Sequence, residues 1–423
     1  MSDTLIYWVW LQKALGYCNP KVKTVLRFYS SVIDFYEGGQ QEWLLCGCFT
    51  KTEFNNLCSV TLDDAKIIID QCNKLGYKMI TPDMPEYPQQ LKEIYEPPSV
   101  LYINGALPDI DSILSIGIVG TRNATNVGKK LAYSIGYDLA KSGVTVVSGG
   151  ALGIDSSAHN GALMAQGTTI CVLGCGINYN YLMTNAQMRS KIAQNGAVIS
   201  EYPPDTPPQK YSFPKRNRII SALSQGVLVV EAGEKSGALI TAKTALQQNK
   251  DVFAIPGDVT NAFAFGTNLL IKQGAIPVTN AQEIINEYSA KYSITLEEPL
   301  PPEQISDNII NSIPTGGRKN VSSKKDVFSS ENINHKNLGI NSDNNSKLNT
   351  NTSFYNNIDL KKELVDVSGN AKIIYDIIFE NPSTVDDIIV KTKLSTAKVM
   401  QALTELELED AVTRKSGGVY ASV

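Results

Sequence analysis

The sequence predicts an α/β protein whose centre is a doubly wound, mostly parallel β-sheet. Between residues 113 and 290, short apolar runs alternate with amphipathic stretches of helical spacing. Some of these runs, such as residues 226–230, contain no polar alternation, which is typical of strands buried on both faces. Regular alternation of such strands with helices favours a parallel sheet covered by helices on both sides.

The strands and helices of this core are expected to alternate along the chain. We expect strands at 115–119, 144–148, 168–173, 197–201, 226–231, 251–255 and 275–278. We expect helices at 126–141, 154–166, 186–194, 216–224, 237–249, 266–273 and 281–288. With a proline-rich stretch at 82–108 and a short strand at 100–103, they define a predicted core of residues 79–290.

Three smaller regions flank the predicted core. Residues 1–78 show helical spacing of apolar residues, so we expect a small helical N-terminal domain. Residues 291–367 are rich in Asn, Ser and Lys, and this composition predicts a disordered linker. In residues 368–423 we expect three helices and a hairpin that turns at Gly417-Gly418, which is the outline of a winged helix.

Composition and charge restrict the class of protein. Hydrophobic residues make up 43% of the chain and charged residues 19%, as in ordinary globular proteins. The formal net charge is −4, but Lys and Arg outnumber Asp and Glu in residues 110–290, so the positive excess lies in this middle segment alone. No apolar run reaches the roughly 18 residues of a membrane span, and no signal peptide is evident. We therefore expect a cytoplasmic protein without membrane contact.

The cysteines and histidines give little sign of metal or acid–base chemistry. The 7 cysteines are expected to be reduced thiols, and the spacings of Cys46, Cys48, Cys58 and Cys72 differ from those of zinc motifs. His159 follows Asp155 by one helical turn. We favour a structural role for His159, as a partner of Asp155 or of a backbone carbonyl, because no nucleophile or metal is apparent. We therefore expect no metal, no cofactor and no catalytic residue.

Loops at the carboxyl ends of the strands are the candidate sites, because doubly wound sheets bind ligands there. In the first loop, Gly120 permits close backbone approach, Thr121 can donate a hydrogen bond and Arg122 can clamp a phosphate, although an exposed arginine is as common there. The second loop opens a helix with glycines, which favours an anion site over a simple tight turn. It consists of Ser148, Gly149 and Gly150.

The densest group of cations lies at the start of a predicted helix. The cations are Lys215, Arg216 and Arg218, with Phe213 just before them and Asn217 among them. The polar side chains can bind successive phosphates, and the phenylalanine ring can stack on a base. The three cations cannot share one helical face, so some of them are alternatively structural partners of Glu201 or Glu231.

Two further loops allow more than one role. Lys235, Ser236 and Gly237 form a small anion-binding turn, and Ser236 is equally suited to cap the following helix. Tyr179 and Tyr181 could stack on bases or pack their own loop, and both roles stay open. Several phosphate-compatible loops along one sheet edge predict a polyanion or a nucleotide lying across that edge.

Taken in order, these motifs resemble those of the DprA/Smf family. The resemblance covers about residues 80–290 and rests on the segments 87–91, 97–102, 118–122, 148–159, 174–176, 213–220 and 236–242. It implies a Rossmann-like core, a helical N-terminal domain of the SAM or helix-hairpin-helix kind, and a C-terminal winged-helix-like domain. Two departures are Ala238, where the family usually has serine, and Leu182, where it usually has proline after Tyr181.

The resemblance also implies a function. Proteins of this family bind and protect incoming single-stranded DNA in natural transformation and recombination, load the RecA recombinase, form homodimers through the core and are not enzymes. The DNA groove that the resemblance implies contains Gly120, Thr121, Arg122, Ser148, Gly149, Gly150, Phe213, Arg216, Asn217, Arg218, Lys235, Ser236 and Gly237. To these predicted site residues we add Lys215, which belongs to the same group of cations. The winged-helix-like domain is expected to contact protein, because its presumed recognition helix, residues 395–410, is acidic.

Two other classes of function are compatible with parts of the pattern. One is a nucleotide phosphoribohydrolase of the lysine-decarboxylase-like class, which has a similar fold but a Pro-Gly-Gly-x-Gly-Thr loop that is missing here. The other is a scaffold whose loops bind only proteins. Salt-dependent affinity for oligo-dT would exclude the scaffold, because phosphate contacts release counterions.

Overall fold

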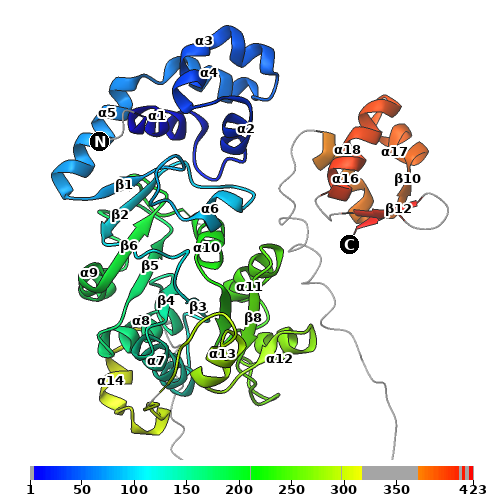
Figure 1. Cartoon of the computed structure of the whole chain (residues 1–423). Helices are drawn as coiled ribbons and strands as arrows, with labels where there is room; N and C mark the ends of the chain where they lie inside the picture. The colour runs from blue at the N-terminus through cyan, green and yellow to red at the C-terminus, as the bar shows by residue number, and fades with distance from the viewer. Residues whose placement is uncertain are drawn as a thin grey trace, which may run out of the picture. The chain divides into compact units, whose positions relative to one another are not determined.

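The structure is a computed structural model of the chain, and it describes residues 4–209, 211–296, 298–316, 370–408, 412–414 and 419–422. The chain forms two compact units, Met1–Lys325 and Asp326–Val423 (Figure 1). Each unit has a hydrophobic core of its own.

A sheet of nine strands, counted over the described residues, runs through the first unit in the order β1-β2-β6-β5-β4-β3-β7-β8-β9. The strands from β6 to β9 in this order are parallel, and β2 pairs antiparallel with both β1 and β6. Because β4 and β7 lie on either side of β3, the direction of winding reverses there, which makes the β3/β7 junction the topological switch point. The strands are β1 (Lys78–Ile80), β2 (Leu101–Gly105), β3 (Ser115–Val119), β4 (Thr145–Ser148), β5 (Thr169–Leu173), β6 (Gly196–Ser200), β7 (Gly226–Val229), β8 (Asp251–Ala254) and β9 (Ile276–Pro277).

Helices cover both faces of this sheet. Alternate residues of β3 enter opposite cores: Ile118 packs with residues of α7, α8 and α13, and Val119 packs with residues of α10, α11 and α12. Burial on both faces explains why these strands lack polar alternation. The helices of the core are α6 (Gln89–Glu93), α7 (Asn126–Lys141), α8 (Ile154–Met164), α9 (Ala186–Asn195), α10 (Ser212–Ala222), α11 (Gly237–Gln247), α12 (Phe265–Lys272) and α13 (Ala281–Glu287), with a 3-10 turn η1 (Met183–Asn185) before α9.

The fold class and the order of the core elements are confirmed. The clearest difference is α10, which begins at Ser212 instead of the expected residue 216. Pro214 does not prevent this earlier start, because a proline in the first turn removes an N–H group that has no helical partner anyway.

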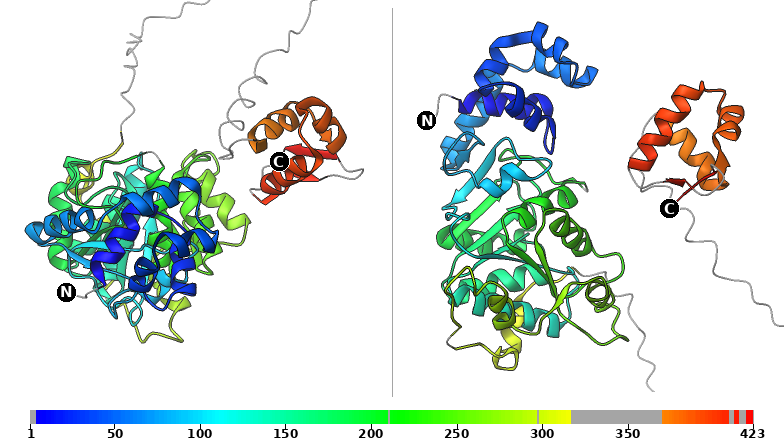
Figure 2. Two further views of the ribbon diagram at one scale, coloured as in Figure 1. Left: turned by 90° about the horizontal axis from the view of Figure 1, so that it is seen from above. Right: turned by 45° about the vertical axis from the view of Figure 1, so that its right-hand side comes forward.

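Five helices of the N-terminal region lie at the β1–β2 end of the sheet (Figures 1 and 2). They bury an aromatic cluster that includes Trp8, Trp10, Phe35 and Trp43. Gln12 joins them to the sheet, because it accepts a hydrogen bond of 2.7 Å from the Tyr102 hydroxyl. The helices are α1 (Leu5–Leu15), α2 (Lys21–Phe28), α3 (Val32–Cys46), α4 (Lys51–Ser59) and α5 (Leu62–Leu75).

The beginning of the predicted linker is packed against the core, so the prediction of disorder is wrong for residues 298–316. This segment contains η2 (Pro302–Gln304) and α14 (Asp307–Ser312). Its apolar side chains surround Tyr133 of α7; they are Leu300, Ile305, Ile310 and Ile313. These four residues are too sparse to stand out in an Asn- and Ser-rich composition, and their burial depends on a partner far away in the chain. Residues 317–367 lie outside the described part.

The second unit contains α16 (Asn370–Glu380), α17 (Val385–Thr392) and α18 (Thr396–Leu408). A small sheet of order β10-β12-β11 accompanies them, formed by Ser383–Thr384, Val419–Ser422 and Val412–Arg414. Thr384 caps α17 in a capping box with Asp387. The predicted winged-helix outline is confirmed, and the predicted turn at Gly417-Gly418 lies outside the described residues.

Within the described ranges, no helix is both long and apolar enough to cross a membrane. The cysteines are free thiols. Over the same ranges, no three His, Cys, Asp or Glu side chains gather into a group that could hold a metal ion.

Candidate nucleic-acid interface

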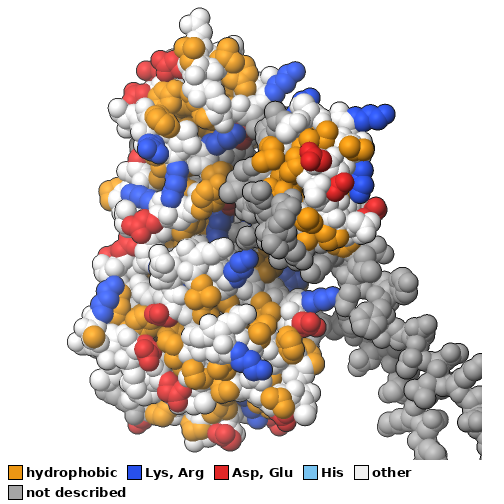
Figure 3. All heavy atoms as spheres, turned by 90° about the vertical axis from the view of Figure 1, so that its right-hand side faces the viewer, with side chains coloured by type: hydrophobic (Ala, Val, Ile, Leu, Met, Phe, Trp, Pro, Cys, Tyr) orange, Lys and Arg blue, Asp and Glu red, His pale blue; other side chains and the backbone are white. Residues whose placement is uncertain are grey.

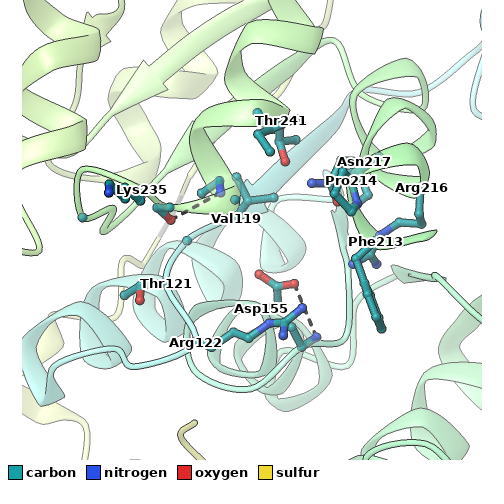
Figure 4. Close-up of a pocket in the computed structure, with 18 of the residues that line it drawn as sticks. Val119, Thr121, Arg122, Asp155, Phe213, Pro214, Arg216, Asn217, Lys235 and Thr241 are labelled. Carbon is teal, nitrogen blue, oxygen red and sulfur yellow. Dashed lines mark hydrogen bonds between the residues drawn. The ribbon is translucent and has the colours of Figure 1, made fainter. Parts of the chain in front are cut away.

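A pocket of about 770 Å³ lies where β3 and β7 end, at the switch point of the sheet. The loop after β3, the first turns of α10 and the turn before α11 supply its walls (Figure 4). The structure therefore brings predicted residues from three distant segments into one site. Those that line it are Gly120, Thr121, Arg122, Phe213, Arg216, Asn217, Lys235, Ser236 and Gly237.

An arginine and two aromatic rings form one side of this pocket. The guanidinium carbon of Arg122 lies 5.3 Å from the ring centroid of Phe213. The Phe213 and Tyr181 centroids are 5.4 Å apart, with ring planes tilted by 39°. Tyr181 therefore lines this pocket, whereas Tyr179 lines a different one. A guanidinium that contacts a ring through its face keeps its N–H edges free for a phosphate.

The loop that carries Arg122 is tied to its neighbours through the backbone. The Thr121 N–H donates to the carbonyl of Glu231 at 2.8 Å, and the Thr125 hydroxyl and N–H both donate to the Glu231 carboxylate. Gly120 is required because a Cβ there would lie 2.5 Å from a side-chain carbon of Ile154.

The opposite side of the pocket is the N-terminus of α11 (Figure 4). Ser236 caps this helix, because its hydroxyl accepts a hydrogen bond from the Ala238 N–H at 3.3 Å. Lys235 is exposed beside the cap, and a Cβ on Gly237 would meet no atom within 4 Å. A cation next to open helix amides is a typical anion-binding corner.

The loop of Ser148, Gly149 and Gly150 does not line the pocket. The Ser148 hydroxyl donates to the Ile118 carbonyl at 2.6 Å, and all three residues are buried. The carbonyl of Gly149 accepts from a terminal nitrogen of Arg216 at 2.8 Å. The structure therefore places this loop beneath the pocket, where it holds Arg216.

Arg216 is only 4% exposed, yet its side chain lines the pocket. Its guanidinium also donates to the carbonyl of Val172, and its Nε–H has no hydrogen-bond partner among the described residues. A Cβ at Gly149 would lie 2.4 Å from this guanidinium, so glycine is needed there. Arg216 therefore combines a structural role with one unsatisfied donor near the pocket.

Arg218 and Lys215 lie outside the pocket. Arg218 is buried and bonds Glu201 with both terminal nitrogens, at 2.7 and 2.9 Å. Arg218 is therefore a structural partner of Glu201, which is one of the two roles that the sequence left open for the cations of this cluster. The Glu201 carboxylate also accepts the Cys18 N–H at 3.1 Å, which connects the N-terminal region to the core. Lys215 is exposed, with its ammonium 5.9 Å from the ring centroid of Tyr211.

Asp155 is a pocket residue that sequence reasoning considered only as a partner of His159. It is 6% exposed, and burial raises the pKa of its carboxyl, against the opposing effect of Arg216. His159 instead contacts the Thr169 hydroxyl at 2.8 Å, and burial lowers its pKa to about 3. His159 is therefore a neutral residue of the core. Only the closeness of a carboxylate to glycine loops in the sequence could have indicated Asp155.

The family model described as DNA recombination-mediator protein A matches residues 78–289. The chain belongs to the DprA/Smf family. A second model, the DprA winged helix domain, matches residues 363–418. Among individual relatives, the DNA processing protein DprA of Bacillus subtilis is 43% identical over 225 residues, which is 53% of this chain and 75% of that protein.

Two solved structures of DprA proteins also match. DNA processing protein A from Streptococcus pneumoniae is 31% identical, covers 68% of this chain and 99% of its own, and has a TM-score of 0.60. DNA processing protein A from Helicobacter pylori, for which a single-stranded DNA binding mode has been described, is 34% identical, covers 51% and 97%, and has a TM-score of 0.47.

Proposed function

We propose that this DprA/Smf protein binds single-stranded DNA in the pocket at the β3/β7 junction and does so without a catalytic step. The observation that carries the proposal is the gathering of Arg122, Phe213 and Lys235 around one pocket. These side chains supply what an unpaired strand offers, because cations bind the phosphates and aromatic rings stack on bases.

Charge alone does not account for such a site. The chain has a net charge of −4, and one face of the molecule shows separate Lys and Arg side chains scattered among hydrophobic, uncharged and acidic ones (Figure 3). We therefore expect stacking to contribute much of the affinity. Because bases are accessible for stacking only in unpaired strands, the site should prefer single strands over duplex.

The test compares full-length protein on oligo-dT and on duplex DNA of equal length, over a series of salt concentrations. We expect tighter binding to oligo-dT and an affinity that falls with salt. Lys235→Ala should weaken binding, and Lys243→Ala is the matched control, because Lys243 is exposed on α11, the helix that follows Lys235, but does not line the pocket. Equal affinity of both variants and the wild type would contradict the assignment.

The competing enzymatic function is hydrolysis of nucleoside monophosphates. Glu231, at the end of β7, is held by the Thr125 hydroxyl and N–H and does not line the pocket, which favours binding over catalysis. Incubation with nucleoside monophosphates should release no free base. Release of base that depends on Asp155, the carboxylate that does line the pocket, would support the enzyme instead.

We further propose that the protein acts in the cytoplasm as a homodimer formed through its core, protects incoming DNA in natural transformation, and loads RecA. Exposed apolar side chains on α11, α12 and the loop between them support a self-association surface. They are Leu246, Val259, Phe265 and Leu269. Light scattering tests the dimer: wild-type protein should give a dimer mass, and Phe265→Glu should reduce that mass. The RecA proposal is tested separately, because wild-type protein should accelerate RecA filament formation on DNA coated with single-strand-binding protein.

A further inference from the structure

Residues 298–316 cross α7 and end beside Arg122; this segment is here called the strap. At its start, the Leu300 N–H donates to the carboxylate of Asp138 at 2.8 Å, and the Ser134 hydroxyl donates to the Leu300 carbonyl. Further along, Ile310 and Ile313 are buried against α7. The strap is thus fixed by both polar and apolar contacts.

A buried lysine anchors the middle of the strap. Lys129 of α7 is 4% exposed, and its ammonium donates to the carbonyl of Ile310 at 2.9 Å. No carboxylate forms an ion pair with Lys129 in the part of the chain that the structure describes. A buried ammonium without a partner is costly, so the strap carbonyl stabilises the charge that α7 places there.

The far end of the strap contacts two loops of the candidate site. The Gly153 N–H donates to the carbonyl of Pro314 at 2.9 Å, and the Gly316 N–H donates to the carbonyl of Arg122 at 2.9 Å. The approach is close, because a Cβ on Gly316 would lie 2.9 Å from the side-chain oxygen of Asn123 and 3.3 Å from the Cβ of Arg122.

These contacts matter because of how the Arg122 loop is otherwise held. Its ends, Thr121 and Thr125, are bound to Glu231, as described above. The peptide carbonyl of Arg122 lies between these two ties and is held by Gly316 of the strap. A shift of this peptide would move the guanidinium away from the Phe213 ring.

We propose that the strap is a positioning segment that holds Arg122 in the geometry required for single-stranded DNA. The inference rests on the proposed function of the pocket, and it adds a determinant that lies outside the pocket lining. Coupling between two sites is reciprocal, so DNA bound at Arg122 should also stabilise the strap.

The first test removes one hydrogen bond in the full-length chain. Gly316→Pro loses the N–H that binds the Arg122 carbonyl, and Gly316→Ala, which adds a similar Cβ but keeps the N–H, is its matched control. We expect Gly316→Pro to bind oligo-dT about three- to tenfold more weakly than Gly316→Ala. In an Arg122→Ala background this difference should vanish, whereas in a Lys235→Ala background it should persist.

The second test releases the strap from α7. Ile313→Asp places a charge in the buried contact, and Ile309→Asp is the control, because Ile309 is 38% exposed on the same segment. We expect only Ile313→Asp to weaken oligo-dT binding, again only when Arg122 is present. Oligo-dT added to wild-type protein should slow hydrogen exchange of the Leu300 and Gly316 amides.

The outcomes separate this inference from the proposed function. If the wild type binds oligo-dT and Arg122→Ala weakens that binding, while Gly316→Pro and Ile313→Asp bind normally, the strap inference is overturned and the pocket assignment stands. Losses that persist undiminished in the Arg122→Ala background would also overturn it. If the wild type does not bind oligo-dT, both proposals fail.

Discussion

The guanidinium of Arg122 lies over the ring of Phe213, with the guanidinium carbon 5.3 Å from the ring centroid. Arg122 lies in the loop after β3 and Phe213 lies in the first turn of α10, so the two residues meet only in the folded chain. Their contact orients a phosphate-binding group next to a base-stacking surface, so one pair of side chains can serve both halves of a nucleotide.

Replacing Arg122 should change how binding responds to salt. For Arg122→Ala we expect weaker oligo-dT binding and a salt slope reduced by about 0.7, the value for one phosphate contact on a single strand. Arg27→Ala is the matched control, because Arg27 is also an arginine beside a phenylalanine ring but does not line the pocket. Its guanidinium carbon lies 5.7 Å from the ring centroid of Phe28, on an N-terminal helix. Fluorescence anisotropy over a salt series measures both slopes. An unchanged slope in Arg122→Ala would remove the phosphate contact from the interpretation.

Phe213→Leu should act on bases instead of phosphates. Loss of one stacked base costs about 1–3 kcal/mol in affinity, so we expect weaker binding to oligo-dT with a nearly unchanged salt slope. An abasic strand of equal length should bind wild type and variant alike. A loss of equal size on the abasic strand would mean that the ring supports Arg122 and does not contact a base.

Arg218→Ala should destabilise the fold, although this residue adjoins the pocket residues in sequence. Removing one partner of a buried ion pair leaves Glu201 unpaired, and this costs about 3–5 kcal/mol of unfolding free energy. Lys215→Ala should change stability by less than about 0.5 kcal/mol, because its side chain is exposed. Urea unfolding followed by circular dichroism measures both. Equal stability of the two variants would contradict the structural role of Arg218.

Asp155 should oppose DNA binding. Its carboxylate shares the pocket with Arg122 and Arg216, and a bound phosphate would add negative charge beside it. Burial already raises the Asp155 pKa, and a phosphate would raise it further, so wild-type affinity should increase as the pH falls and the carboxyl takes up a proton. We expect Asp155→Asn to bind oligo-dT roughly two- to tenfold more tightly at neutral pH. Its affinity should also depend less on pH; weaker binding would instead assign Asp155 a role in shaping the pocket.

Asp138 should make stability depend on pH. Burial raises its pKa to about 6, against the opposing hydrogen bond from the Leu300 N–H. A raised folded-state pKa means that the contribution to stability is present below the ordinary value of about 4 and is lost as the pH rises through 6. Asp138→Asn keeps an oxygen acceptor for the Leu300 N–H and cannot ionise. Urea unfolding should therefore show a smaller loss of stability between pH 4 and pH 6 in the variant, and identical profiles would refute this cause.

Much of the fold and part of the candidate site followed from the sequence alone. Strands without polar alternation, separated by amphipathic helices, predicted a sheet buried on both faces, and β3, β7 and their neighbours have that environment. Parallel strands end at one edge of a sheet, so glycine loops and cations at strand ends were expected to meet. Arg122, Phe213 and Lys235 do meet there.

Only the tertiary structure decided what each cation contacts. Arg216 and Arg218 are two residues apart on α10. Arg216 lines the pocket and donates to the carbonyl of Gly149, whereas Arg218 is buried against Glu201. The same limit applied to residues 298–316, whose composition predicted a linker but whose few apolar side chains are buried around Tyr133. Local pattern determines backbone conformation and which positions are buried, because those depend on neighbouring residues. The partner of a charge or of an isolated apolar side chain is set by contacts between segments far apart in the chain.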